Sequence, residues 1–309
     1  MHFVDAKGIL SSTNGMNLYR GCTHGCIYCD ARSKCYQFTH EFEDIEVKQN
    51  APQLLEQALR SKRKKCMIGT GSMCDPYMHC EEQLQLTRRC LEMIDRYEFG
   101  LAIQTKSDMI LRDLDLLKSI NRKAKCVVQM TLTTYDEELC KILEPNVCTT
   151  KRRFEVLEIL RDEGIPTVVW LSPILPFIND TKENIDGILD YCVRAKVHGI
   201  ICFGMGVTLR EGDREYFYAA LDKHFPGLKK RYQEKYGLAY EVTSDNHKEL
   251  MNNLRTRCKE SNILSFPVNS FFSKPSLYVF VMENVKISSS ARISLETRAD
   301  NQNIFPHHR

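Results

Sequence analysis

Short apolar runs that alternate with helix-like segments are the feature that most constrains the fold of this chain. The runs VVQMTL, IPTVVWL and GIICFGM are almost entirely apolar, as expected of parallel strands covered on both faces. The alternation predicts right-handed βαβ units, and hence an open doubly wound sheet or an incomplete barrel. The expected strands are 16–20, 66–71, 100–105, 126–132, 166–171 and 199–205, and the expected helices between them are 52–62, 81–97, 111–120, 150–163 and 182–196.

The length of 309 residues leaves room for more than this core. Two further helical patterns lie at 214–236 and 246–259, and the chain changes character after about residue 261, where Ser and Asn become frequent. We therefore expect a core domain at 1–212, a C-terminal helical extension at 213–260 and an atypical, poorly ordered tail at 261–309.

The chain shows no sign of a membrane or secretory role. Its longest apolar run, residues 277–282, is far shorter than the roughly 20 residues that span a bilayer, and the first residues lack a signal-peptide layout. We expect a cytoplasmic protein with no membrane partner. In a reducing compartment, closely spaced members of the 14 cysteines favour metal binding over disulfides.

Only one group of cysteines is tightly spaced. Cys22, Cys26 and Cys29 form a CxxxCxxC loop directly after the first expected strand, and Gly21 and Gly25 give its backbone the freedom to curl around a metal group. Because a [4Fe–4S] cluster normally takes four thiolates, three ligands leave one iron open for a small molecule.

Two other interpretations of this spacing stay open. A structural zinc ion could use the three cysteines with His24 or Cys35, although no second ligand hook follows. Cys26 and Cys29 could also form a redox-active CxxC pair.

The segment NLYRGCTHGCIYCDAR resembles the spore photoproduct lyase-like branch of the radical S-adenosylmethionine (SAM) superfamily. Further similar segments are GTGSMCDPY at 69–77, QTKS at 104–107, TLTT at 131–134 and LSP at 171–173, so that the resemblance covers about residues 5–260. It implies a partial (β/α)6 barrel of the TIM type with a C-terminal helical extension, and a cysteine loop at the carboxyl ends of the strands.

The resemblance also implies the cofactors. Cys22, Cys26 and Cys29 would bind three irons of a [4Fe–4S] cluster, and SAM would chelate the fourth. A one-electron reductant such as flavodoxin or ferredoxin would drive the cleavage of SAM to methionine and a 5′-deoxyadenosyl radical, which takes a hydrogen atom from a substrate.

Further site residues follow from the same resemblance. Tyr28 would lie against the SAM adenine. Thr70, Gly71 and Ser72 would let the backbone approach the methionine part of SAM, and Lys106, next to Ser107, would pair with its carboxylate. Thr131 and Ser172 would line the ribose or substrate space.

Cys74 is the candidate catalytic residue. Spore photoproduct lyase has a cysteine in the matching segment that returns a hydrogen atom to the product radical, but alignment on Asp75 puts Ser72 at that place. We expect Cys74 to line or fill the pocket, and we expect the spore thymine dimer not to be repaired efficiently.

The sequence does not identify the substrate. Damaged nucleic acid is one candidate, and basic runs at 60–65, 151–153 and 229–231 are its weak support. A non-catalytic metal-binding module, or a degraded family member, is the alternative to a radical SAM enzyme.

Overall fold

A parallel sheet of seven strands forms the centre of the molecule. The computed structural model describes residues 1–267. The strand order is β12-β9-β8-β7-β6-β5-β2, and each neighbouring pair is parallel. The strands are β2 (Gly15–Met16), β5 (Met67–Thr70), β6 (Gly100–Thr105), β7 (Cys126–Thr131), β8 (Thr167–Trp170), β9 (Gly199–Cys202) and β12 (Leu264–Pro267).

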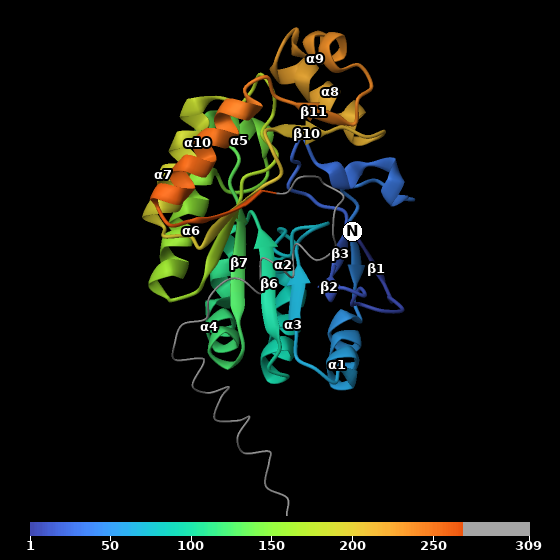
Figure 1. The fold of residues 1–309 in the computed structure, drawn as a ribbon. Helices are drawn as coiled ribbons and strands as arrows, with labels where there is room; N and C mark the ends of the chain where they lie inside the picture. The colour runs from blue at the N-terminus through green and yellow to red at the C-terminus, as the bar shows by residue number, and fades with distance from the viewer. Residues whose placement is uncertain (268–309) are drawn as a thin grey trace, which may run out of the picture.

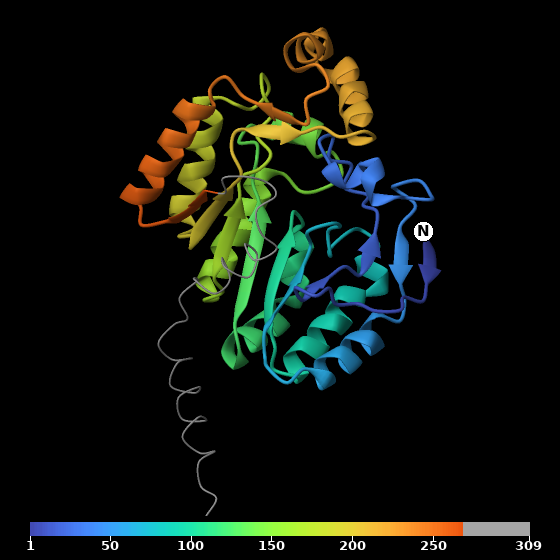
Figure 2. The same ribbon diagram turned by 45° about the vertical axis from the view of Figure 1, so that its right-hand side comes forward.

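The main helices cover the outer face of this curved sheet (Figures 1 and 2). They are α1 (Ala51–Ser61), α3 (Leu86–Arg96), α4 (Leu114–Lys123), α6 (Thr150–Asp162), α7 (Lys182–Arg194) and α10 (His247–Glu260). Shorter helices are α2 (Glu81–Leu84), α5 (Glu137–Leu143) and the 3₁₀ turns η1 (Asp30–Arg32), η2 (Lys34–Tyr36) and η3 (Asp108–Asp113). The architecture is the partial TIM-type barrel that the family resemblance implies, and not the open doubly wound sheet that the strand pattern also allowed.

The period of two along each strand separates an outer from an inner core. Leu101, Val128 and Val169 belong to the large cluster beneath the helices. Their neighbours Ala102, Val127, Val168 and Ile201 form a second small cluster, which fills the inside of the barrel. The inward-pointing residues therefore occupy alternate positions, and their last members reach the carboxyl edge of the sheet.

Two small sheets flank the barrel. In the first, β4 (Glu46–Lys48) lies between β1 (His2–Val4) and β3 (Tyr19–Arg20). In the second, β10 (Gly206–Thr208) pairs with β11 (Glu241–Thr243), and with α8 (Asp213–His224) and α9 (Leu228–Tyr236) it forms a lobe above the strand ends (Figure 1).

Three sequence expectations need correction. The run 16–20 is not one strand, because Gly15–Met16 joins the barrel and Tyr19–Arg20 joins the small sheet. The region 213–260 is not a purely helical extension, because it contains β11 and because α10 packs on the barrel, where Asn253 and Arg257 contact Asp186 and Asp190 of α7.

The expected tail begins too early. Leu264–Pro267 pairs with Gly199–Cys202 as the edge strand β12, so residues 261–267 belong to the barrel. Leu264 continues the ladder because its N–H donates to the His198 carbonyl at 3.1 Å. The rest of the expected tail, 268–309, lies outside the described residues.

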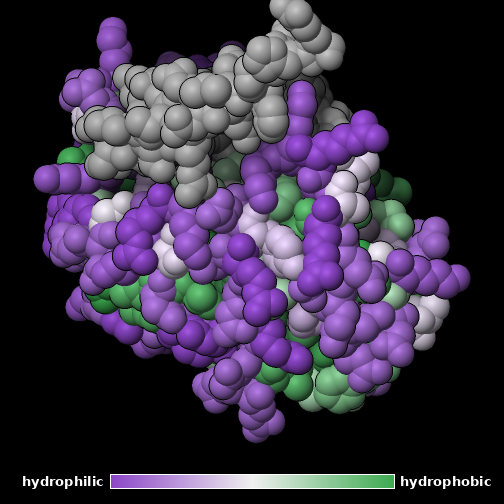
Figure 3. All heavy atoms as spheres, turned by 90° about the horizontal axis from the view of Figure 1, so that it is seen from below, coloured by the Kyte–Doolittle hydropathy of each residue, from purple (hydrophilic) through white to green (hydrophobic). Residues whose placement is uncertain are grey.

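The part of the face at the amino ends of the strands that is visible in Figure 3 is mostly hydrophilic, with small hydrophobic areas between the polar side chains. Within residues 1–267, no helix has the length and apolar character needed to cross a membrane.

Candidate active site at the carboxyl edge of the barrel

A cavity of about 290 Å³ lies at the carboxyl ends of the barrel strands, between the cysteine loop and β10. Ligand sites of parallel α/β folds lie at this edge, because the loops that follow the strands meet there. Ten of the twelve site residues expected from the sequence line it: Cys22, Cys26, Tyr28, Cys29, Gly71, Ser72, Cys74, Lys106, Thr131 and Ser172.

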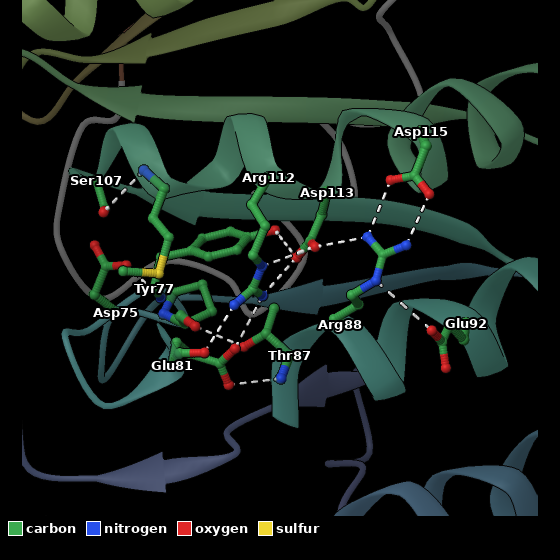
Figure 4. Close-up of polar contacts among 12 residues, drawn as sticks. Asp75, Tyr77, Glu81, Thr87, Arg88, Glu92, Ser107, Arg112, Asp113 and Asp115 are labelled. Carbon is green, nitrogen blue, oxygen red and sulfur yellow. Dashed lines mark hydrogen bonds and ion pairs between the residues drawn. The ribbon is translucent and has the colours of Figure 1, made fainter. Parts of the chain in front are cut away.

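The other two expected residues, Thr70 and Ser107, do not line the cavity. Ile68 packs in the outer core, and Thr70 follows it by two residues. Residues two apart on a strand face the same side, so Thr70 points away from the barrel interior as Ile68 does. The Ser107 hydroxyl instead caps η3 by accepting a hydrogen bond from the Met109 amide at 3.2 Å (Figure 4). Both residues support the fold at the edge of the site.

The cysteine loop is held by the segment that precedes β4. Gly21 has φ +90°, and a Cβ there would lie 2.3 Å from the Phe42 carbonyl oxygen, so only glycine fits. The next residue, Cys22, donates its backbone N–H to the same carbonyl at 3.3 Å. This close approach fixes where the first cysteine enters the cavity.

The end of α5 and the turn after it hold the rest of the loop. Ile27 donates its N–H to the Leu143 carbonyl at 3.0 Å, and the Asn146 amide donates to the His24 carbonyl at 3.1 Å. The Asn146 side chain donates to the Thr23 carbonyl at 2.9 Å. The loop is therefore built into the barrel on both sides.

The three loop thiols lie farther apart than the ligands of one bound zinc ion. Thiolates on one tetrahedral zinc ion lie about 3.8 Å apart, given a Zn–S bond of about 2.3 Å. The sulfurs of Cys22, Cys26 and Cys29 do not all lie within 4.8 Å of one another. Each thiolate of a [4Fe–4S] cluster binds a different iron, so such a cluster needs the wider spacing.

Burial makes these thiols poor acids without a cofactor. It raises the pKa of Cys26 to about 12, partly offset by the positive charge of Lys106, and it also raises the pKa of Cys22 and Cys29. A metal group that binds the thiolates would supply the positive charge that deprotonation needs.

Asp75 joins three parts of the site, and the sequence analysis did not select it. Its carboxylate accepts hydrogen bonds from the Thr105 hydroxyl and from the Lys106 backbone N–H, both at 2.7 Å. It also lies 3.6 Å from Nδ1 of the buried His24 in the cysteine loop. The similar segment GTGSMCDPY at 69–77, which contains Asp75, was the available signal.

A polar network anchors the segment after β5 behind Asp75 (Figure 4). The Tyr77 hydroxyl donates to the Asp113 carboxylate at 3.1 Å. Arg112 bridges Asp113 and Glu81, at 2.8 and 3.0 Å, and both carboxylates are fully buried. These contacts hold the strand-end backbone of residues 71–75 against the cavity.

A buried ion pair supports Tyr28. The Tyr28 hydroxyl donates to the Glu144 carboxylate, which pairs with Arg153 at 2.5 Å. Arg153 also donates to the Thr131 carbonyl at 3.1 Å. Although burial favours the neutral acid, the cations Arg153 and Lys106 hold the pKa of Glu144 below its usual value. Arg153, counted with a basic run in the sequence, is thus a fully buried support of the site.

The inner face adds residues that the sequence analysis missed. Gln104 and Trp170 are the last inward-pointing residues of β6 and β8, Phe203 directly follows β9, and all three line the cavity. The rings of Trp170 and Phe203 lie 5.3 Å apart. The buried Oε1 of Gln104 and Oγ1 of Thr131 have no hydrogen-bond partner within the described chain, as expected of atoms that meet a polar ligand.

Cys74 lies at the edge of the cavity. Its side chain is 6% exposed, and its Sγ donates to the Tyr19 carbonyl at 3.0 Å. Burial raises the pKa of this thiol to about 12. Cys74 is therefore a neutral thiol tied to the neighbouring backbone.

Curated relatives are similar to this chain over much of its sequence. The Mycobacterium tuberculosis protein Rv2578c is 30% identical over 234 residues, which cover 72% of this chain and 66% of that protein. The Methanocaldococcus jannaschii protein MJ0683 is 34% identical over 169 residues, which cover 54% of this chain and 62% of that protein. The chain spans slightly less than two thirds of the length of these relatives.

Solved structures of spore photoproduct lyase have a similar fold. One, complexed with dinucleoside spore photoproduct, gives a TM-score of 0.60 at 15% identity over 81% of this chain and 74% of that one. A variant with bound AdoMet and dinucleoside spore photoproduct gives a TM-score of 0.60 at 13% identity, and the match covers 81% of this chain and 75% of that one. The model of the Radical SAM superfamily matches residues 16–192, more than half of the sequence. The chain belongs to the radical SAM superfamily.

Proposed function

We propose that this protein is a radical SAM enzyme that binds one [4Fe–4S] cluster through Cys22, Cys26 and Cys29. One observation carries the proposal: the three thiols and the strand-end residues open into the same cavity. When bound, the cluster and SAM supply reductive cleavage of SAM and a 5′-deoxyadenosyl radical that starts chemistry on a substrate. A reductant such as flavodoxin or ferredoxin would provide the electron.

The residues of the chain position SAM in this proposal. Gly71 has φ +100°, and a Cβ there would lie 2.0 Å from the Gln104 carbonyl oxygen, so only glycine fits where this backbone lines the cavity and would face the methionine part. Lys106, whose ammonium has no ion-pair partner within 4.0 Å in the described chain, would pair with the SAM carboxylate. Its Nζ lies 5.9 Å from the centre of the Tyr28 ring.

The unpartnered oxygens would receive the polar edge of the adenosyl group. Gln104 Oε1 and Thr131 Oγ1 are available for this because no described group satisfies them. Tyr28 would provide a flat wall whose orientation is fixed by its hydrogen bond to Glu144. Ser172, whose hydroxyl accepts from the Phe203 amide at 3.1 Å, would line the substrate side.

The substrate side of the cavity favours a flat molecule. Trp170, Phe203 and Tyr36 present aromatic surface there, and aromatic rings stack on nucleobases without regard to sequence. A lyase-type reaction on a modified nucleobase is therefore our finer proposal. Cys74 would line this space and would not donate a hydrogen atom, because its S–H already faces the Tyr19 carbonyl.

The test is an anaerobic assay of SAM cleavage. Protein reconstituted with iron and sulfide, then reduced with dithionite, should convert SAM to 5′-deoxyadenosine even without substrate. The matched control replaces Cys22, Cys26 and Cys29 by Ala and should give none. Stoichiometric zinc, with no iron after reconstitution, would support the non-catalytic metal-binding module instead. An intact iron cluster without SAM cleavage would identify a degraded family member.

A further inference from the structure

A second group of metal-binding side chains lies outside the cavity, on the small sheet. β1 pairs with β4 in parallel, and this register places His2 beside Glu46. His40 reaches the same place from the loop before β4. One ligand atom from each of these three residues lies within 4.8 Å of the other two, and no other group of three such residues in 1–267 meets this spacing.

The histidines are oriented as metal ligands usually are. His40 Nδ1 lies 2.9 Å from the Glu41 carbonyl, which can only accept, so Nδ1 carries the proton. His2 Nδ1 lies 3.0 Å from the Asp44 carboxylate. In neutral rings, both arrangements leave the Nε2 lone pair free, and such outer hydrogen bonds fix the tautomer of metal-binding histidines.

The free nitrogen of His40 faces an anion. His40 Nε2 is buried without a hydrogen-bond partner in the described chain and lies 3.9 Å from the Glu46 carboxylate. A lone pair beside a carboxylate is unfavourable, so this nitrogen either carries a proton and pairs with Glu46 or shares a cation with it. Arg20 is the register partner of Glu46 on β3, but its guanidinium donates to the carbonyls of Tyr36 and Gln37 instead.

We propose that His2, His40 and Glu46 form a zinc site that is separate from the cysteine loop. Two imidazoles and one carboxylate form a common zinc ligand set, which leaves a fourth position for water. The nitrogen and oxygen ligands of one zinc ion lie about 3.4 Å apart, given bonds of about 2.0–2.1 Å. The ligand atoms of His2, His40 and Glu46, which lie within 4.8 Å of one another, must therefore move closer when zinc binds. His2 can move because its side chain is 39% exposed, whereas His40 and Glu46 are 15% and 19% exposed.

The site would reinforce segments that already pair, since β1 runs parallel to β4 and the His2 N–H donates to the Ile45 carbonyl at 2.9 Å. It would tie β1 and the loop around His40 to β4, and the same loop provides the Phe42 carbonyl that accepts from the Cys22 amide. A zinc ion at the His2–His40–Glu46 site would therefore stiffen the support of the cysteine loop without entering the cavity.

The experiment must exclude metal binding by the cysteine loop. The full-length chain with Cys22, Cys26 and Cys29 replaced by Ser is freed of metal with a chelator and titrated with Co²⁺. We expect one equivalent to bind, with visible d–d bands and no thiolate charge-transfer band, and Zn²⁺ to displace it. Because this chain lacks the cluster ligands, the result is independent of SAM cleavage.

Substitutions in this chain locate the ion. His40→Ala and Glu46→Gln should each weaken Co²⁺ binding at least tenfold, whereas His224→Ala, at an exposed histidine of α8, should leave it unchanged. Zn²⁺ should raise the melting temperature of the parent but not that of Glu46→Gln, which keeps the shape of the side chain. Absence of stoichiometric binding, or binding that survives both substitutions, would overturn the proposal.

Discussion

The cavity has two walls that are built in different ways. The cysteine loop is continuous in sequence, and its three thiols are set by one tight stretch of backbone that contacts Phe42, Leu143 and Asn146. The opposite wall takes single residues from separate strands, such as Gln104, Thr131 and Trp170, and the sheet register alone brings them together.

This difference has a chemical consequence. In the proposed function, the loop wall has one task, the binding of a metal group, which would fail when any ligand is lost. The strand-end wall distributes recognition over several polar and aromatic groups, each of which contributes a part. Changes to the loop should therefore act in an all-or-none way, and changes at the strand ends should be graded.

The largest effect should come from the loop. Replacement of Cys22, Cys26 or Cys29 by Ala should reduce bound iron from about four per chain to nearly none, because the loop offers only three thiolates. Iron and sulfide analysis after anaerobic reconstitution measures this. Cys66→Ala, at a half-buried cysteine next to β5, is the control and should keep full iron. Retention of the cluster without one loop cysteine would remove the contrast between the walls.

The next effect concerns the junction of the two walls. Arg153→Met leaves the buried Glu144 carboxylate without its cation and should lower the free energy of unfolding by about 3–5 kcal/mol. Urea unfolding of the protein before reconstitution measures it. The double variant Arg153→Met with Glu144→Gln should recover part of the loss. A single variant as stable as the parent would show that this pair does not hold the walls together.

Lys106 should give a graded effect on ligand binding. Lys106→Ala should weaken SAM binding roughly 10- to 100-fold, since a hydrogen bond to a charged group contributes about 1.5–3 kcal/mol. Calorimetric titration of the reconstituted protein measures it, and Lys106→Arg should lose less because the charge remains. Equal affinity in all three proteins would mean that Lys106 does not contact SAM.

The smallest effect tests the alternation along the strands. Thr131→Val removes an inward hydroxyl without a partner and should weaken SAM binding about 2- to 10-fold, as expected for a neutral hydrogen bond. Thr70→Val and Ser107→Ala remove hydroxyls that lie outside the cavity and should change the affinity for SAM less than about twofold. The reverse order would show that the cavity is lined differently in the SAM complex.

The sequence by itself predicted the covered parallel strands and singled out the cysteine loop. Apolar runs such as 126–132 are typical of covered parallel strands, and the expected strand 100–105 coincides with β6, but only the resemblance to a family favoured a partial barrel over an open sheet. Cys22, Cys26 and Cys29 were evident as candidate ligands because a short loop brings nearby residues together whatever the rest of the chain does. Lys106, Thr131 and Ser172 followed from the resemblance, and all three line the cavity at the strand ends.

The tertiary structure alone decided which strand-end residues face the cavity and which distant residues meet. Successive residues of a strand point to opposite faces, so Thr70 faces outward and Gly71 faces the cavity. The sequence predicts the ends of a strand only to within a residue or two, which is too coarse to tell which residues face inward. The pair of Glu144 and Arg153 matches no motif in the sequence. His2 is far from His40 and Glu46 in the chain, and these three residues match no motif either. Their contacts depend on strand register and loop packing, which are set by the burial of the whole core.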